Sequence, residues 1–467
     1  MAQIDIARVV DEQRISRFHV MVVGMSFLLM VADGYDNISI AYVAPLLIQE
    51  WGVDKSALGP LFGVGLLGGL FGPPIFGYLG DRYGRKLTVI GGAFFFGLLT
   101  LAQVWADSLH SMMTLRFIAG IGIGGVLPIT IAFNAEFAPK RVRATMIMLS
   151  FVGVAIGGAL GGVVASQFMG TYGWQVVFWS GGFAPMLIGL AALVYLPESI
   201  KFLSLRPERR EELVALLLRI DRNLRIPADA LFILSDESNR TRIAFRDIFA
   251  GRLAVVTPLY WAVNVISLLV FFFVNQWTPV LLTSAGMPAE RAAMGTILVM
   301  LGGFVGALAT MRPVDKFGFT PVPILFAVGI PAVSLIGVSG LAEATVMALV
   351  FLSGFCLVAL QFGIVATETQ IYPTYIRSVG VGSCVAFGRV GSVLGPLLGG
   401  ALLARNVTVQ DLFYVAGGLL AIGLVAAMAL TPLYRKRMRE MSSGDSVAWD
   451  PDRTVPRAAS PIPVRMP

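Results

Sequence analysis

Two aspartates, Asp33 and Asp36, lie within an apolar stretch at positions 18–47. Their spacing places both carboxylates on one face of a helix. Two acids held close together in surroundings of low dielectric repel each other, and burial disfavours the charge on each. Both effects favour the uptake of a proton. We therefore predict that Asp36 and Asp33 carry or exchange protons.

Three more charged residues, Arg116, Glu368 and Arg389, lie inside other apolar stretches. A charged side chain at the centre of a bilayer costs about 2.5–3.5 kcal/mol, so such residues usually face a cavity. Arg389 follows the basic residue Arg377 by roughly 18 Å of helix, which is about half the thickness of a membrane. A guanidinium there suits a carboxylate ligand. The alternatives are an ion pair with Glu368 or a bond to a helix carbonyl.

The composition indicates a membrane protein. Of the 467 residues, 56% are hydrophobic and 13% are charged, whereas soluble domains carry about 25% charged residues. A membrane-spanning helix needs about 20 mostly apolar residues. Twelve such stretches are predicted, at 18–47, 56–79, 87–106, 111–135, 144–168, 174–196, 254–283, 290–311, 320–340, 344–371, 379–404 and 411–433. The expected fold class is an all-α membrane protein with twelve transmembrane helices in two pseudo-symmetric six-helix bundles.

The net charge of +7 reflects membrane orientation, and no nucleic-acid partner is expected. Basic residues gather in alternate loops, at Arg82, Arg85, Lys86, Lys140, Arg141, Arg143, Arg312, Lys316 and Arg377, whereas the other loops carry only Lys55, Arg291 and Arg405. By the positive-inside rule both termini lie in the cytoplasm, which requires an even number of spans. The two cysteines lie within apolar stretches and the two histidines lie near helix ends, so neither a metal site nor a cofactor is predicted.

The two halves of the chain repeat each other at a constant offset. Asp81-Arg82-Tyr83-Gly84 and Asp315-Lys316-Phe317-Gly318 are 234 positions apart, and so are Pro139 and Pro373, and Gly157 and Gly391. Parallel repeats of this kind place a cavity between two halves that rock against each other. The predicted units are a cytoplasmic N-terminus (1–17), a first bundle (18–196), a cytoplasmic linker (197–252), a second bundle (253–433) and a disordered cytoplasmic tail (434–467).

Several motifs resemble those of one transporter family. The segment Gly-Tyr-Leu-Gly-Asp-Arg-Tyr-Gly-Arg-Lys at 77–86 is similar to the signature loop of the major facilitator superfamily. Arg116, followed by glycines at 120, 122 and 124, resembles a further motif of that superfamily. Asp33-Gly34-Tyr35-Asp36 resembles the corresponding element of the aromatic acid:proton symporters, and Leu-Pro-Glu-Ser at 196–199 fits the same group. The superfamily resemblance covers about 18–433.

The resemblance implies a monomeric importer in a bacterial inner membrane, with a proton and a small aromatic acid such as benzoate or hydroxybenzoate as partners. The related sugar porters pair a first-helix aspartate with a fourth-helix arginine, which implies an Asp36–Arg116 pair. A static bridge that only aligns two helices is the alternative. The substrate-binding candidates are Arg389, Arg116, Tyr35, Glu368, Trp277 and Phe387. The repeat places Ser267 and Val270 opposite the two aspartates, so proton chemistry is expected mainly in the first half.

The signature loop is expected to close the cytoplasmic side in the outward-open state. Asp81 is predicted to cap the N-terminus of a neighbouring helix and to pair with Arg143. Gly77 and Gly84 allow close approach and a tight turn. The second copy has Met311 in place of Gly77, so the first copy should do most of the gating. The full set of gate residues is Gly77, Asp81, Arg82, Gly84, Arg85, Glu136, Arg143 and Arg377.

Other functions remain open from the sequence. The chain could move a sugar, a shikimate-like acid or, by proton antiport, a drug. A sugar is disfavoured because the last span ends in Leu-Thr-Pro-Leu-Tyr at 430–434, unlike the ending of the sugar porters. A sensor on the same scaffold is disfavoured because it needs no proton path. No nucleophile, metal or nucleotide motif suggests an enzyme.

Overall fold

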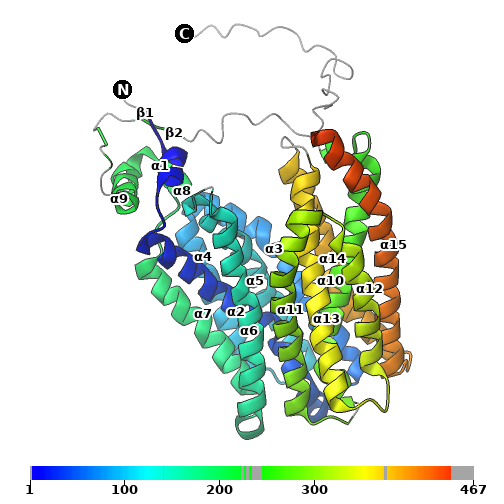
Figure 1. The fold of residues 1–467 in the computed structure, drawn as a ribbon. Helices are drawn as coiled ribbons and strands as arrows, with labels where there is room; N and C mark the ends of the chain where they lie inside the picture. The colour runs from blue at the N-terminus through cyan, green and yellow to red at the C-terminus, as the bar shows by residue number, and fades with distance from the viewer. Residues whose placement is uncertain are drawn as a thin grey trace.

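The computed structural model describes residues 3–139, 141–221, 224, 226–227, 231–233, 245–284, 286–372 and 376–442. The described chain is almost entirely helical, and its long helices run side by side in two groups (Figure 1). The first group contains α2 Arg17–Trp51, α3 Leu58–Tyr83, α4 Arg85–Ala102, α5 Leu109–Phe137, α6 Arg143–Tyr172 and α7 Gln175–Tyr195. The second contains α10 Leu253–Ser284, α11 Ala289–Phe317, α12 Pro321–Ser334, α13 Glu343–Ile371, α14 Arg377–Leu403 and α15 Val409–Ser442.

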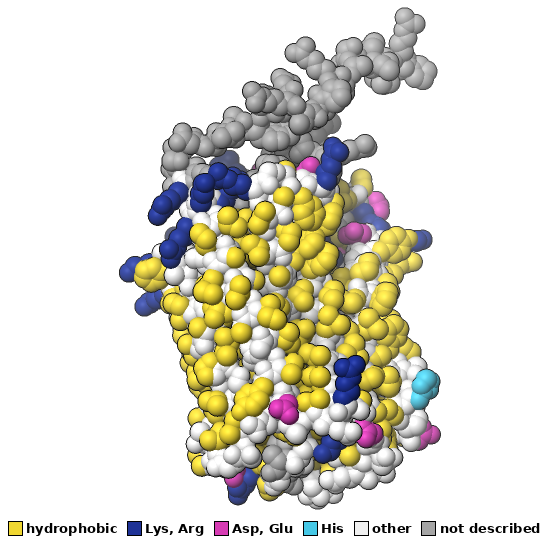
Figure 2. Space-filling view, turned by 90° about the vertical axis from the view of Figure 1, so that its right-hand side faces the viewer, with side chains coloured by type: hydrophobic (Ala, Val, Ile, Leu, Met, Phe, Trp, Pro, Cys, Tyr) yellow, Lys and Arg dark blue, Asp and Glu magenta, His cyan; other side chains and the backbone are white. Residues whose placement is uncertain are grey.

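Among the described residues, 11 helices are long and apolar enough to cross a membrane. The ninth of the twelve predicted spans, at 320–340, is shorter than expected. There α12 passes into a 3-10 turn that ends at Gly337, and the backbone is extended at Val338. The apolar helix Pro321–Gly337 is therefore about 25 Å long. Hydrophobic side chains cover the middle of the face in Figure 2, and Lys and Arg gather mostly toward one end.

Several helices extend beyond their predicted bounds, among them α2 and α15. Helix α2 continues to Trp51 and stops at Gly52, whose φ of 62° is the left-handed conformation common after a helix. Helix α15 continues to Ser442, so the first residues of the predicted disordered tail are helical. The rest of that tail, 443–467, lies outside the described residues.

The sequence repeat is also a repeat of contacts. A Cβ on Gly157 would lie 1.9 Å from the carbonyl oxygen of Val31, and a Cβ on Gly391 would lie 2.1 Å from that of Val265. Both the glycines and the carbonyls are 234 positions apart. Helices α2 and α6 therefore meet through their backbones just as α10 and α14 do. Small residues permit this packing inside membranes.

Replacing Gly157 with alanine should lower the stability of the first half. The added methyl group overlaps a backbone carbonyl that cannot rotate away, and overpacking of this kind costs about 1–3 kcal/mol. Gly91→Ala is the matched control because nothing lies within 4 Å of a Cβ at Gly91. Thermal unfolding of the purified variants should show a lower midpoint for Gly157→Ala alone. Equal midpoints would contradict the backbone contact.

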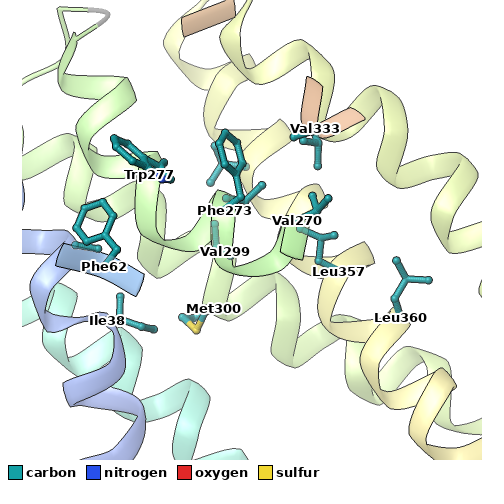
Figure 3. Packing of buried hydrophobic residues seen from close by; sticks show 14 of the residues in the cluster. Ile38, Phe62, Val270, Phe273, Trp277, Val299, Met300, Val333, Leu357 and Leu360 are labelled. Atoms are coloured by element: carbon teal, nitrogen blue, oxygen red, sulfur yellow. The ribbon is translucent and has the colours of Figure 1, made fainter. Parts of the chain in front are cut away.

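The two halves meet tightly at the end of the molecule opposite α1 and the C-terminus of α15 (Figure 1). The ring centroids of Phe62 and Trp277 lie 5.2 Å apart across this interface. Figure 3 shows the two side chains next to each other. The Nζ of Lys55 donates a hydrogen bond of 2.9 Å to the Oγ of Ser284. The molecule is therefore closed at this end.

The N-terminus and the linker form a packed layer on the first half. Strand β1 Gln3–Asp5 pairs in parallel with β2 Leu231–Ile233. The helices of this layer are α1 Ile6–Glu12, α8 Ile200–Ser204 and α9 Arg210–Ile220. The buried side chains of α9 (Leu213, Leu216, Leu217 and Ile220) join a core that includes Ile6, Val10 and Phe18. Helix α9 lies within the predicted linker, and its helical-period apolar face makes it part of this core.

Candidate functional site

A cavity of about 470 Å³ lies between the two halves and is lined by residues of α2, α3, α5 and α6 and of α10, α11, α13 and α14. This volume is in the range of small-molecule sites. Its walls are mainly apolar, and aromatic rings are prominent among them: Phe62, Phe151, Phe271, Phe272, Phe304 and Phe362. The charged residues on its lining are Asp33, Asp36, Arg116 and Arg389. The cavity lies between the two halves, as the sequence repeat predicts.

The ion pair expected between Asp36 and Arg116 is present. Nη1 of Arg116 donates to Oδ2 of Asp36 at 2.8 Å, and Nη2 donates to the Oγ of Ser39 at 2.9 Å. Thr100 donates to the other Asp36 oxygen, Oδ1, at 2.7 Å. Three helices, α2, α4 and α5, thus converge on one buried carboxylate.

Burial makes this pair sensitive to the loss of either charge. The side chains of Arg116 and Asp36 are 5% and 0% exposed. A buried ion pair survives only with good geometry and added hydrogen bonds, and breaking it leaves an uncompensated charge. Both Asp36 oxygens have a partner, whereas Nε of Arg116 has none among the described residues. Protonation of Asp36 would therefore free a guanidinium on the cavity wall.

Asp33 and Arg389 line the cavity from opposite halves. They are close enough to attract each other electrostatically. Arg389 forms no ion pair with any described residue, and its Nη1 donates to the backbone oxygen of Gly69 at 3.0 Å. Of the two alternatives to ligand binding considered for Arg389, the carbonyl bond is thus observed. This hydrogen bond holds the guanidinium against the opposite half, but a carbonyl does not neutralise its positive charge.

Two aromatic residues expected in the site point elsewhere. The hydroxyl of Tyr35 lies 2.6 Å from the Oγ of Ser180 on α7, which turns the ring away from the cavity. Nε1 of Trp277 donates to the backbone oxygen of Pro396 at 3.1 Å. Trp277 is fully buried in the interface that closes the molecule (Figure 3). Neither residue lines the cavity.

Phe387 and Glu368 also lie outside the cavity lining. Phe387 stacks on Trp261, with ring centroids 3.7 Å apart. Glu368 is buried elsewhere in the second half, so the ion pair considered between it and Arg389 does not form. In this conformation the two side chains lie away from the cavity, and helical position alone does not tell which neighbouring helix a side chain faces.

The predicted Asp81–Arg143 pair is absent from the described structure. Asp81 is exposed. Arg143 instead approaches Oδ1 of Asp11 at 3.9 Å, and its Nε donates to the backbone oxygen of Ala138 at 3.2 Å. Open space surrounds Gly77, so the expected close approach does not occur there. The signature loop is not closed in this conformation.

Other predicted gate residues contact one another within the first half. Arg85 pairs with Glu136, which also accepts a hydrogen bond of 2.5 Å from the Oγ of Ser199. Glu198 accepts from the backbone nitrogen of Lys86 at 3.0 Å and so caps the start of α4. Gly84 makes the expected tight turn, with φ of 100°.

The remaining predicted gate residues are Arg82, near the end of α3, and Arg377, at the start of α14. Nη1 of Arg82 donates to the hydroxyl of Tyr78 at 2.8 Å. Nε of Arg377 donates to the backbone oxygen of Tyr372 at 3.5 Å. This bond repeats the Arg143 to Ala138 bond 234 positions later. Arg377 therefore has the local role of Arg143 in the second half.

The sequence reasoning missed the amide side chains of the site. The cavity lining includes Asn37, Asn264, Asn275, Gln276 and Gln361. Nε2 of Gln276 donates to the backbone oxygen of Asn37 at 3.0 Å, across the two halves. The side-chain oxygens of Asn264, Asn275 and Gln276 have no partner among the described residues. These residues are recognisable in the sequence as uncharged polar groups inside apolar stretches. They were missed because only charged residues were considered as candidates.

Residues 25–367 match the family described as Major Facilitator Superfamily. Among curated proteins, the chain is 30% identical to a gallate transporter of Pseudomonas putida, over 94% of this chain and 97% of that protein. It is 29% identical to the 4-hydroxybenzoate transporter PcaK of Pseudomonas aeruginosa, over 93% of this chain and 96% of that protein.

Solved structures show the same fold. The inward open xylose transporter XylE from E. coli aligns with a TM-score of 0.66 at 16% identity, covering 88% of this chain and 95% of that one. A bacterial homologue of the human lysosomal transporter Spinster, in an inward-facing conformation, gives 0.64 at 16% identity, covering 92% and 99%. The chain belongs to the major facilitator superfamily, is a membrane transporter and not an enzyme, and groups there with transporters of aromatic acids.

Proposed function

We propose that this protein is a proton-coupled symporter that imports a small aromatic carboxylate by alternating access. The observation that carries the proposal is the cavity between the halves. It combines aromatic walls, the unneutralised guanidinium of Arg389 and the buried Asp36–Arg116 pair. A ring fits the phenylalanines, and a carboxylate fits Arg389.

The geometry of Asp36 supports the proposed proton coupling. When Asp36 binds a proton, Arg116 loses its counter-ion and is free to attract the substrate carboxylate or to let α2 and α5 separate. Asp33, on the same face of α2 and on the cavity wall, serves as a second site or modulator. Proton and substrate binding are thereby linked through one arginine.

Energetics favours symport for an anion. Moving one negative charge into a cell with a negative interior costs about 2.3 kcal/mol per 100 mV. A proton carried in the same direction cancels this charge and adds the pH gradient as a driving force. Import of a carboxylate alone would work against the potential.

The proposed setting is a bacterial inner membrane, with a monomer whose termini both lie in the cytoplasm. In this orientation the tightly packed end at Phe62 and Trp277 is the outer side, and the structure is closed to the outside. The Asp81–Arg143 pair then belongs to the opposite, outward-open state, in which the cytoplasmic side closes.

Within the aromatic acids, the cavity amides favour a hydroxylated ring. The side-chain oxygens of Asn264, Asn275 and Gln276, which lack a partner among the described residues, can accept hydrogen bonds. Buried polar groups without partners cost about 1–3 kcal/mol each. We therefore expect 4-hydroxybenzoate or a more hydroxylated acid to bind more tightly than benzoate.

Uptake by proteoliposomes with an imposed pH gradient tests the proposal. Labelled 4-hydroxybenzoate, benzoate, xylose, a dicarboxylate and a cationic drug are compared with and without a protonophore. We expect concentrative uptake of the aromatic acids alone, stronger for the hydroxylated one, which the protonophore abolishes. Uptake of xylose but no acid, or proton-driven export of the drug, would replace this function with one of the alternatives.

A further inference from the structure

The second half contains a buried acid that the proposed transport cycle does not use. Glu368 lies three residues before the end of α13, is 0% exposed and lies outside the cavity lining. Neither of its carboxyl oxygens has a hydrogen-bond partner among the described residues. An ionised carboxylate in this position would be a buried charge without a hydrogen-bond partner among the described residues.

The described surroundings offer no compensating charge. Tyr260 of α10 and Cys384 of α14 lie beside Glu368, and the hydroxyl of Tyr260 also lacks a described partner. Helix α12 contributes no ionisable side chain. The remaining ionisable groups of the packed helices near this end are Tyr372 after α13, Arg377 of α14, Tyr434, Arg435, Lys436, Arg437 and Arg439 of α15, and the exposed residues Arg312, Asp315 and Lys316 of α11. No described lysine or arginine pairs with Glu368.

The repeat shows what this place looks like without an acid. The positions 234 earlier than Tyr260, Glu368 and Cys384 are Ser26, Asn134 and Ser150. There, Ser26 donates to Oδ1 of Asn134 at 2.9 Å, and Nδ2 of Asn134 donates to the Oγ of Ser150 at 2.9 Å. The first half thus fills the position with a neutral amide that is bonded on both sides. The second half places a carboxyl there and, within the described residues, leaves its oxygens without bonds.

We infer that Glu368 is a second proton-binding site, separate from Asp33 and Asp36, and that it holds a proton in the conformation described. A buried carboxylate without a partner is strongly disfavoured, whereas the protonated form needs only one acceptor. The hydroxyl of Tyr260 and the sulfur of Cys384 are the acceptors at hand. The inference concerns a proton and this acid only, so it does not rest on the proposed substrate.

A chain of polar groups connects the site to the linker. The hydroxyl of Tyr372 lies 3.6 Å from Sγ of Cys384 and donates to Oγ1 of Thr257 at 3.0 Å. Thr257 in turn donates to the backbone oxygen of Ile248 at 2.8 Å, in the short helix Phe245–Phe249. The proton of Glu368 can therefore exchange at the end of the molecule that carries the linker. Separation of α10, α13 and α14 at that end would admit water and release it.

Infrared spectra of the full-length protein in proteoliposomes test this directly. A protonated carboxyl group has a C=O stretching band that an ionised one lacks. We expect the wild-type protein to show this band at neutral pH and the isosteric variant Glu368→Gln to lose it. Glu343→Gln is the matched control, because Glu343 is an exposed acid at the other end of α13 that pairs with Arg291. It should leave the band unchanged.

A second variant covers the case in which Glu368→Gln does not fold. Tyr260→Phe removes the neighbouring hydroxyl and should shift the frequency of the band without removing it. Thermal unfolding adds a pH test: the wild type should lose stability relative to Glu368→Gln as the pH rises, because only the wild type has a carboxyl group to ionise there. Identical wild-type and Glu368→Gln spectra at neutral pH would overturn the inference. The readout needs no substrate, so it can fail while the proposed transport holds, and the reverse is also true.

Discussion

Replacing Asp36 with asparagine is expected to abolish accumulation of the aromatic acid against its gradient. With one proton moving per anion, each unit of pH difference supports about tenfold accumulation, because a tenfold gradient is worth about 1.4 kcal/mol. Asparagine cannot release a proton, so this coupling is lost. The internal concentration should then rise no higher than the external one. Initial uptake and steady-state accumulation in proteoliposomes measure the two effects.

The variant must be separated from a folding defect, since it leaves Arg116 charged in a buried site. Breaking a buried ion pair costs about 3–5 kcal/mol, although the introduced asparagine would retain the bond from Thr100. The double variant Asp36→Asn/Arg116→Gln removes both charges and should recover stability without recovering accumulation. Exchange of labelled for unlabelled substrate should persist in Asp36→Asn, because exchange requires binding and movement but no net proton transfer.

Asp54→Asn is the matched control for this experiment. Asp54 is an exposed aspartate that caps the short helix after α2, and asparagine caps equally well. It should accumulate substrate like the wild type. Normal pH-driven accumulation by Asp36→Asn would remove Asp36 from the coupling mechanism and support the alternative of a static bridge.

Much of the fold was predictable because the membrane restricts it. Long apolar stretches must become helices, and the 234-residue offset shows that the halves are equivalent. The Asp36–Arg116 pair, which the resemblance to the sugar porters implied, is present in the structure. The predicted span at 320–340 was too long because hydropathy does not reveal the turn that ends at Gly337.

The prediction of the site was less complete, for physical reasons. Tyr35 and Trp277 have polar groups that bond to α7 and to the backbone of α14, and no periodicity shows which neighbour a ring will choose. Pairing between Asp81 and Arg143 depends on the conformational state of the transporter, whereas the sequence is the same in every state. The amides of the cavity wall were overlooked because an uncharged group in an apolar helix is a weak signal.

Replacing Arg389 with alanine should weaken binding of the carboxylate substrate by about ten- to a hundredfold. Hydrogen bonds to charged groups contribute about 1.5–3 kcal/mol, and within the described residues Arg389 has only a neutral carbonyl as its bonded partner. Arg389→Lys keeps the charge but loses the planar arrangement of donors. Its affinity for the substrate should therefore lie between those of the wild type and Arg389→Ala. Equilibrium binding of labelled 4-hydroxybenzoate to the purified protein measures the effect.

The contact between Arg389 and Gly69 joins the two halves, so the same arginine could act on the conformational change alone. The two roles predict different kinetics. A substrate ligand raises KM and the dissociation constant together, whereas a contact used only for gating changes kcat and leaves equilibrium binding as it was. Arg405→Ala is the control, since Arg405 is exposed just after α14 and should alter neither quantity. Unchanged binding by Arg389→Ala, with slowed transport, would reassign Arg389 to the gate and leave Arg116, once freed by protonation of Asp36, as the carboxylate ligand.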